Sequence, residues 1–313
     1  PAIISIYLGD QLEDVVEQLV STGTADHSLK GGRLMTGVRT LPDLAKDATD
    51  RNRTSPFAFT GNKFEFRMVG SSDSVASPNI VLNTIVAQAF REASEVLESA
   101  ENFEIAVHDL IKKNCAEHQR IIFNGNGYSE AWVEEAKRRG LSNIRSMVDA
   151  IPALVSDKSV ALFEKFKVFT RAELESRVEV KYEGYSKAIN VEARAMVDIA
   201  GKQIIPAVIK YVKNLADTIN SVNGVGGIDV SVEMELLTET SQLLKETQNA
   251  WKVLRERVEA ASAMEPGEQQ ARYYYEQVTT AMEDLRSPVD QLEMIVDKSV
   301  WPMPSYGDLM FEV

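Results

Sequence analysis

The stretch from residue 101 to residue 297 constrains the fold most, because nearly all of it has the apolar spacing of α-helices. Between Ile205 and Val222, for example, side chains that could form a buried stripe recur every three or four positions. They are Val208, Tyr211, Leu215, Thr218, Ile219 and Val222. A chain with this pattern must bury one face of each helix against other helices.

Breaks in the pattern divide residues 170–297 into long segments. The NGVGGID run at 223–229 and the MEPG run at 264–267 each interrupt the helical spacing. We therefore expect three or four long antiparallel helices packed as a bundle. Ser287-Pro288 predicts a kink or a restart in the last helix, and the tail at 301–313, which has two prolines, is predicted to be extended.

The first hundred residues include strand-like patterns that the rest of the chain lacks, so the chain as a whole is predicted to be an α+β protein. This part has alternating or continuous apolar runs typical of strands and a Gly- and Thr-rich stretch at 21–50 that we interpret as a long loop. It also has two predicted helices, a short amphipathic one in GDQLEDVVEQLV after the first strand and a longer one after the loop. Ser77-Pro78 is a typical helix start, and Ile80, Leu82, Ile85, Val86 and Phe90 would form the buried face of that helix. The predicted organisation is a domain over 1–100 with a few antiparallel strands, at 2–8, 56–60 and 62–69, and a helix at 78–98. A helical region over 101–300 and the tail at 301–313 follow.

Charge and cysteine content exclude several classes of protein. The 313 residues carry a formal net charge of −13, which argues against binding to nucleic acid or to an anionic membrane surface. No apolar run approaches the ~18–20 residues that a membrane span needs. With one cysteine, Cys115, and no signal peptide, the chain is expected to be cytoplasmic. Because Pro1 leads straight into an apolar strand, AIISIYL, we also expect the chain to be the C-terminal portion of a larger protein.

The positive charge of this acidic chain gathers in residues 51–67, RNRTSPFAFTGNKFEFR. Because strand side chains alternate between faces, Lys63, Glu65 and Arg67 would share one face, about 6.5–7 Å apart, with phenylalanines on the other. Arg51 and Arg53 can converge on the charged face if the chain folds back. One carboxylate among several cations suits a phosphorylated ligand that brings Mg²⁺ or Mn²⁺. The alternative is a solvated strand face, on which each charge pair contributes about 0.2–1 kcal/mol.

Three motifs in this region resemble the second half of a glutamine synthetase catalytic domain. They are Asn52-Arg53-Thr54-Ser55, then Lys63-Phe64-Glu65-Phe66-Arg67, then Ser77-Pro78-Asn79. The sequence FAFTGNKFEFR and the helical region that follows it are most similar to the type III, large bacterial form. The fold implied by the resemblance is the end of a catalytic domain followed by a helical bundle.

The resemblance also implies site roles. Glu65 would be a ligand of the metal ion at the nucleotide phosphates, Lys63 and Arg53 would contact ATP phosphates, and Arg53 and Arg67 would be the catalytic residues. Arg67 would hold the substrate glutamate or its phosphorylated γ-carboxyl. One departure is that a further arginine of the family falls on Ala58 in this sequence. Either another cation takes the place of that arginine, with Lys30 and Arg33 as candidates, or the phosphate site differs.

The function implied is that of an ATP-dependent glutamate–ammonia ligase of nitrogen metabolism, with ATP and Mg²⁺ or Mn²⁺ as cofactors. Glutamate and ammonia would be converted to glutamine through γ-glutamyl phosphate, in a homo-oligomer expected to be a dodecamer of two hexameric rings. Because most metal ligands of the family would lie before Pro1, the isolated chain is expected to be inactive. Two alternatives stay open: a non-catalytic helical interaction or oligomerisation module, and a related ATP-dependent carboxylate–amine ligase.

Overall fold

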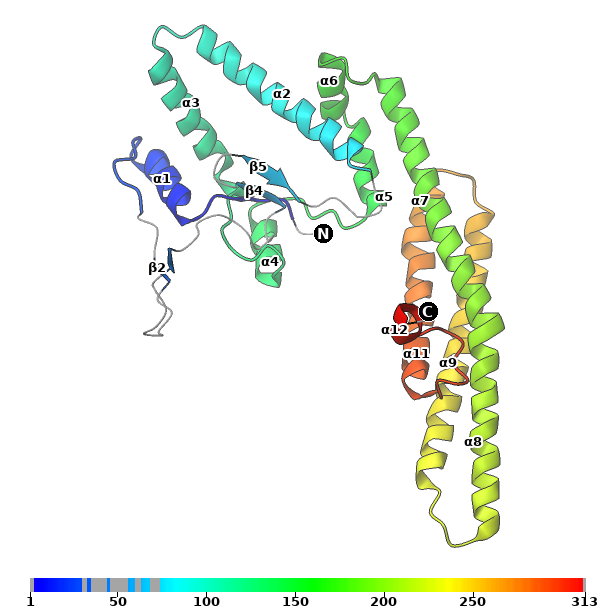
Figure 1. Cartoon of the computed structure of the whole chain (residues 1–313). Coiled ribbons are helices and arrows are strands. Elements are labelled where there is room, and N and C mark those ends of the chain that lie inside the picture. Colours follow the sequence, from blue (N-terminus) through cyan, green and yellow to red (C-terminus); the bar gives the residue numbers. More distant parts are fainter. Residues whose placement is uncertain are drawn as a thin grey trace. The chain divides into compact units, whose positions relative to one another are not determined.

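The computed structural model describes residues 3–29, 33–34, 44–45, 56–59, 63–67 and 74–311. The chain divides into two compact units, which are coloured along the sequence in Figure 1. The N-terminal unit comprises Pro1–Arg145 and Ser156–Arg171, and the helical unit comprises Ser146–Val155 and Ala172–Val313. Each unit is described here by itself.

A small three-stranded sheet carries the charged segment of the N-terminal unit. Its order is β1 (Ile6–Tyr7), β4 (Phe57–Phe59) and β5 (Phe64–Phe66). β4 pairs antiparallel with β5, as expected, but β1 pairs parallel with β4, whereas the sequence predicted antiparallel strands. A parallel neighbour requires a crossover connection, and helix α1 (Asp10–Ser21) lies within it.

The segment that we interpreted as a long loop, 21–50, contains two short strands. These are β2 (Arg33–Leu34) and β3 (Leu44–Ala45), which pair antiparallel. The remaining helices of the N-terminal unit are α2 (Ala76–Glu98), α3 (Phe103–His118), the 3-10 helix η1 (Gln119–Ile121), α4 (Glu130–Arg138) and α6 (Asp157–Lys165).

Helix α2 begins two residues before the predicted start. Ala76 is its first residue, and the Ala76 amide donates to the Ser74 hydroxyl at 3.2 Å. Pro78 therefore lies inside the first turn, where a missing N–H removes no intrahelical bond.

The predicted buried face of α2 is wrong for Ile85, Val86 and Phe90. All three side chains are exposed, Phe90 to 73%, and Thr84 is the buried residue of the helix. Within the described residues α2 packs on α3 and α6, and those contacts leave this apolar stripe uncovered. The predicted helix is correct, but the prediction assumed that another part of the chain covers its apolar face.

The start of the sheet is fixed to α4 by a small core. Trp132 is fully buried together with Ala136 and Ile3. The Trp132 ring stacks on Phe123 with 4.0 Å between ring centroids, and its indole N–H donates to the Ile3 carbonyl at 3.5 Å. Residues far apart in sequence are thereby held together around strand β1.

The helical unit is built from long helices, and the chain reverses its direction twice between them (Figure 1). After α5 (Met147–Ala150) and the 3-10 helix η2 (Ile151–Val155), the chain forms α7 (Arg171–Ile199), the π-helical turn η3 (Ala200–Ile204) and α8 (Ile205–Val225). It returns along α9 (Ser231–Ser262). It continues through α10 (Glu268–Tyr273), the π-helical turn η4 (Tyr274–Val278), α11 (Thr279–Ile295) and α12 (Tyr306–Phe311).

The breaks between these helices lie where the sequence predicted them. α8 ends at Val225, and Gly226 and Gly227 follow with φ of +82° and +74°, values that favour glycine. Pro288, by contrast, lies inside a continuous α11 and is buried there, so the predicted restart does not occur.

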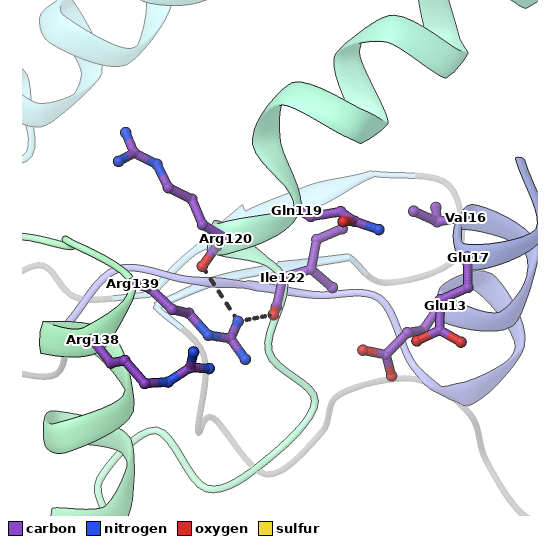
Figure 2. Close-up of a pocket in the computed structure, with 8 residues that line it drawn as sticks. All are labelled: Glu13, Val16, Glu17, Gln119, Arg120, Ile122, Arg138 and Arg139. Atoms are coloured by element: carbon purple, nitrogen blue, oxygen red, sulfur yellow. Dashed lines mark hydrogen bonds between the residues drawn. The ribbon is translucent and has the colours of Figure 1, made fainter. Parts of the chain in front are cut away.

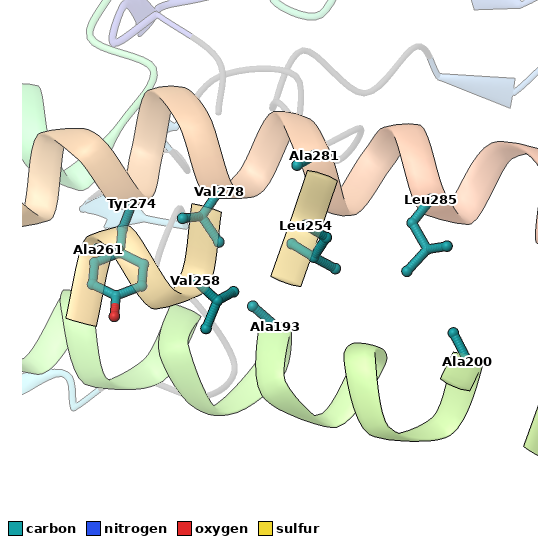
Figure 3. Close-up of a cluster of buried hydrophobic side chains, with 9 residues drawn as sticks. All are labelled: Ala193, Ala200, Leu254, Val258, Ala261, Tyr274, Val278, Ala281 and Leu285. Carbon is teal, nitrogen blue, oxygen red and sulfur yellow. The ribbon is translucent and has the colours of Figure 1, made fainter. Parts of the chain in front are cut away.

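The main core of the helical unit lies between α7, α9 and α11 (Figure 3). Its buried residues are Ala193, Ala200, Leu254, Val258, Ala261, Tyr274, Val278, Ala281 and Leu285. In the figure the α9 side chains point between the other two helices. Ala193 on α7 and Ala200 on η3 thus face larger side chains from α9, η4 and α11, which allows the helices to approach closely.

The tail is not fully extended, as the sequence had led us to expect, because Tyr306–Phe311 form helix α12. The Ser305 amide and hydroxyl donate to the Asp308 carboxylate, each at 2.7 Å, and the Asp308 amide donates to the Ser305 hydroxyl at 3.3 Å. This reciprocal capping starts a helix after the second proline. The Ser305–Asp308 pattern is present in the sequence, but the prediction of an extended tail rested on the two prolines alone.

A tryptophan of α9 binds the last turn of α7, next to the π-helical turn η3. The indole N–H of Trp251 donates to the Val197 carbonyl at 2.8 Å. A methyl group at Gly201 would lie 3.0–3.1 Å from three atoms of the indole ring, so a larger residue there would press on the Trp251 ring.

We expect Trp251→Phe to lower the free energy of unfolding of the helical unit by about 1–2 kcal/mol, because the Val197 carbonyl loses its indole donor. Urea denaturation followed by circular dichroism measures it. Trp301→Phe is the control, since the Trp301 indole donates at 3.2 Å to Glu293 in an exposed bond. Equal effects of the two changes would contradict this reading of the Trp251 contact.

Candidate functional site

Strand β5 and its flanking residues bring Lys63, Glu65 and Arg67 together on one face, as the alternation predicted. Lys63 Nζ lies 3.6 Å from Glu65 Oε1. Arg67 approaches from the other side, and its Nε and Nη2 both donate to Glu65 Oε2 at 3.2 Å. The carboxylate is therefore held between two cations.

Phenylalanines occupy the opposite face of the same two strands. Phe57 and Phe64 stack with 5.2 Å between centroids and 8° between ring planes, and Phe59 lies 5.1 Å from Phe64. These ring contacts fix the register of β4 on β5 and thereby the direction in which Glu65 points.

The position opposite Glu65 is occupied by a small residue. Ala58 pairs in register with Glu65 and is fully buried. Ala58 is the position on which the further family arginine falls, so no cation reaches Glu65 from β4 at this point of the ladder.

The three charged side chains differ in access to solvent. The exposed fractions are 66% for Lys63, 39% for Glu65 and 16% for Arg67. Arg67 is thus a largely buried anchor for Glu65, whereas the Lys63 contact is an exposed ion pair of the kind that contributes ~0.2–1 kcal/mol. A ligand could displace such a pair at small cost.

These features fit Glu65 as one ligand of a hard cation. A carboxylate oxygen is the donor that Mg²⁺ prefers, and Glu65 is reachable from solvent and oriented by Arg67. Across the part of the chain that the structure describes, no group of three or more His, Cys, Asp or Glu side chains is placed to hold a metal ion. Glu65 would therefore contribute one ligand of a set.

The other predicted site residues cannot be placed. Arg51, Arg53 and Lys30 lie outside the described residues, and Arg33 is described only as the first residue of β2. Their roles stay predictions. In the described ranges, no helix combines the length and the apolar character that crossing a membrane requires.

Comparison with known proteins supports the resemblance drawn from the motifs. Residues 106–223 match a family described as the glutamine synthetase C-terminal domain. Across 324 aligned residues the chain is 37% identical to the type-3 glutamine synthetase of Dictyostelium discoideum. It is 34% identical to the glutamine synthetases of Bacteroides fragilis (strain YCH46) and Butyrivibrio fibrisolvens.

These similarities cover the whole of this chain but only part of each relative. The alignments include 99%, 99% and 100% of the chain, against 43%, 44% and 45% of the three relatives. The chain thus spans less than half the length of the curated relatives it matches. The predicted resemblance to glutamine synthetases is confirmed along nearly the entire chain, and one of the three relatives is named a type-3 enzyme.

Proposed function

We propose that the chain, which is related along nearly its whole length to type III glutamine synthetases, is part of an enzyme that makes glutamine from glutamate, ammonia and ATP. The observation that carries this proposal is the 34–37% identity over 99–100% of the chain to three proteins named glutamine synthetase, one of them a type-3 enzyme. The geometry around Glu65 supports it independently, because a carboxylate set between cations suits a metal–polyphosphate ligand.

The proposed roles follow the strand face. Glu65 would bind Mg²⁺ or Mn²⁺, which neutralises charge on the phosphates of ATP when bound. Lys63, exposed and flexible, would turn from Glu65 to a phosphate oxygen. Arg53 would contact the transferred phosphoryl group.

Arg67 would position Glu65, and its two hydrogen bonds to that carboxylate support this role. Its Nε and Nη2 are directed to one oxygen of Glu65, which leaves the second oxygen, near Lys63, as the more available ligand atom. In the proposed enzyme Arg67 would also hold the substrate glutamate or its phosphorylated γ-carboxyl. Phosphorylation makes that carboxyl reactive toward ammonia, and fixed cations hold the two anions together.

Assembly into a homo-oligomer, in the form of two hexameric rings, is part of the proposal. The uncovered apolar stripe of α2, formed by Ile85, Val86 and Phe90, favours burial against another part of such an assembly. The dodecamer and the cytoplasmic location stay predictions.

Isothermal titration distinguishes the enzyme from the alternative of a helical interaction module. A glutamine synthetase that contains this chain is expected to bind a non-hydrolysable ATP analogue with Mg²⁺, and to form glutamine when given ATP, glutamate and ammonia. The 313-residue chain by itself is expected to form none. Absence of nucleotide binding by the longer protein would favour the interaction module, and glutamine synthesis by the chain alone would refute the expected need for further ligands.

A further inference from the structure

A second group of charged residues lies in the N-terminal unit, in a pocket of about 300 Å³ (Figure 2). Helix α1, the turn after α3 and the end of α4 supply its walls. The lining residues are Glu13, Val16, Glu17, Gln119, Arg120, Ile122, Arg138 and Arg139. The volume is at the lower end of the ~300–1,000 Å³ range of small-molecule sites.

The cationic wall is held firmly in place. Arg138 makes two hydrogen bonds to Glu135, at 2.7 and 2.6 Å. Arg139 also pairs with Glu135, and its Nη1 donates to the carbonyls of Ile122 at 2.8 Å and Arg120 at 3.3 Å. The two guanidinium groups lower the pKa of Glu135 to about 2, so this carboxylate stays ionised at neutral pH.

The anionic wall is anchored as well. Glu13 accepts from Asn124 Nδ2 at 2.5 Å, and Asn124 Oδ1 accepts from the amides of Leu8 and Gly9 at 3.0 Å each. Glu17 lies one helical turn beyond Glu13 on α1 and lines the same pocket.

The two walls face each other without direct contact. Figure 2 shows the carboxylates of Glu13 and Glu17 on one side and the guanidinium groups of Arg138 and Arg139 on the other. Among the ion pairs of the described residues, none joins a pocket arginine to Glu13 or Glu17. The space between opposite charges is therefore open to a ligand.

Charge balance selects the kind of ligand. Arg138 and Arg139 both pair with Glu135, so this group of three keeps one net positive charge opposite the two carboxylates of α1. The side chain of Arg120 is directed away from α1 (Figure 2). A simple anion would be repelled by Glu13 and Glu17, and a simple cation by the arginines. A small dipolar molecule satisfies both walls.

We propose that this pocket binds a free α-amino acid, with its carboxylate toward the arginines and its ammonium group toward Glu13 and Glu17. Val16 and Ile122 supply the apolar surface for a short aliphatic side chain. The pocket shares no lining residue with the Lys63–Glu65–Arg67 face. The inference does not depend on glutamine synthesis.

L-valine is the probe, and its two half-charged derivatives are the matched controls. In NMR titrations of the 313-residue chain, L-valine is expected to give saturable shifts of resonances from α1 and α4. N-acetyl-L-valine, which lacks the ammonium group, and L-valinamide, which lacks the carboxylate, are expected to bind at least ~10-fold more weakly. Equal binding of either derivative, or no saturable shift with L-valine, would overturn the proposal.

Variants locate the site. Glu17→Gln is expected to weaken L-valine binding about tenfold, whereas Glu130→Gln, an exposed change on α4 outside the pocket lining, is expected to leave it unchanged. Wild-type affinity in Glu17→Gln would also overturn the proposal. Because the readout is binding to this chain, its failure leaves the proposed glutamine synthesis untouched.

Discussion

Replacing Glu65 with glutamine in the proposed glutamine synthetase that contains this chain is expected to lower the rate of glutamine formation by about 100- to 1,000-fold. The amide has the same size and keeps an oxygen that can accept from Arg67, which now donates to Glu65 at 3.2 Å. What it removes is the negative charge that would bind the divalent cation. The measurement is a steady-state assay at several Mg²⁺ concentrations.

Glu95→Gln is the control for this prediction. Glu95 is an exposed carboxylate that pairs with Arg91 at 3.1 Å on α2, so it has a cationic neighbour but no place on the β5 face. We expect the activity of the Glu95→Gln variant to match that of the unmodified enzyme. Near-normal activity of the Glu65 variant at all Mg²⁺ concentrations would refute the metal-ligand role.

Replacing Leu254 with alanine is expected to lower the free energy of unfolding of the helical unit by about 2–5 kcal/mol. Leu254 is 0% exposed and lies in the core between α7, α9 and α11. Truncation would leave a cavity between three helices that already meet through small residues and cannot close on it. Urea denaturation followed by circular dichroism and tryptophan fluorescence measures the change.

Val253→Ala is the matched control, one residue earlier on the same helix. Val253 is 41% exposed, and we expect its truncation to change the free energy of unfolding by less than ~0.5 kcal/mol. If the two variants lost stability equally, the helical unit would not have the core described here.

Local patterns in the sequence predicted the parts of the fold that depend on neighbouring residues. Period-two alternation placed Lys63, Glu65 and Arg67 on one strand face, and their contacts confirm it. Apolar spacing and glycine runs predicted the long helices and the break between α8 and α9. Both patterns follow from backbone geometry within a few residues, which is why they can be read without a structure.

Features that depend on distant partners could not be predicted in the same way. The parallel pairing of β1 with β4 joins residues about fifty positions apart, and nothing in either strand specifies its neighbour. The stripe of Ile85, Val86 and Phe90 signalled an apolar face but not whether the described chain covers it.

The candidate sites differ in the same respect. The Glu65 face lies within five consecutive residues and was visible in the sequence. The pocket on α1 combines residues 13–17 with residues 119–139, and each of its charges taken alone looks like an ordinary surface residue. Adjacent Arg138 and Arg139 were a possible signal, but only the fold opposes them to Glu13 and Glu17.

The most direct test of the account is the position of the metal ion. Crystals of the proposed glutamine synthetase that contains this chain, grown with Mn²⁺ and a non-hydrolysable ATP analogue, would locate the ion by anomalous scattering. We predict an ion in direct coordination with a Glu65 oxygen and with phosphate oxygens, and Lys63 turned toward the nucleotide. An ion bound elsewhere, with Glu65 still paired to Lys63 and Arg67, would contradict the proposed site.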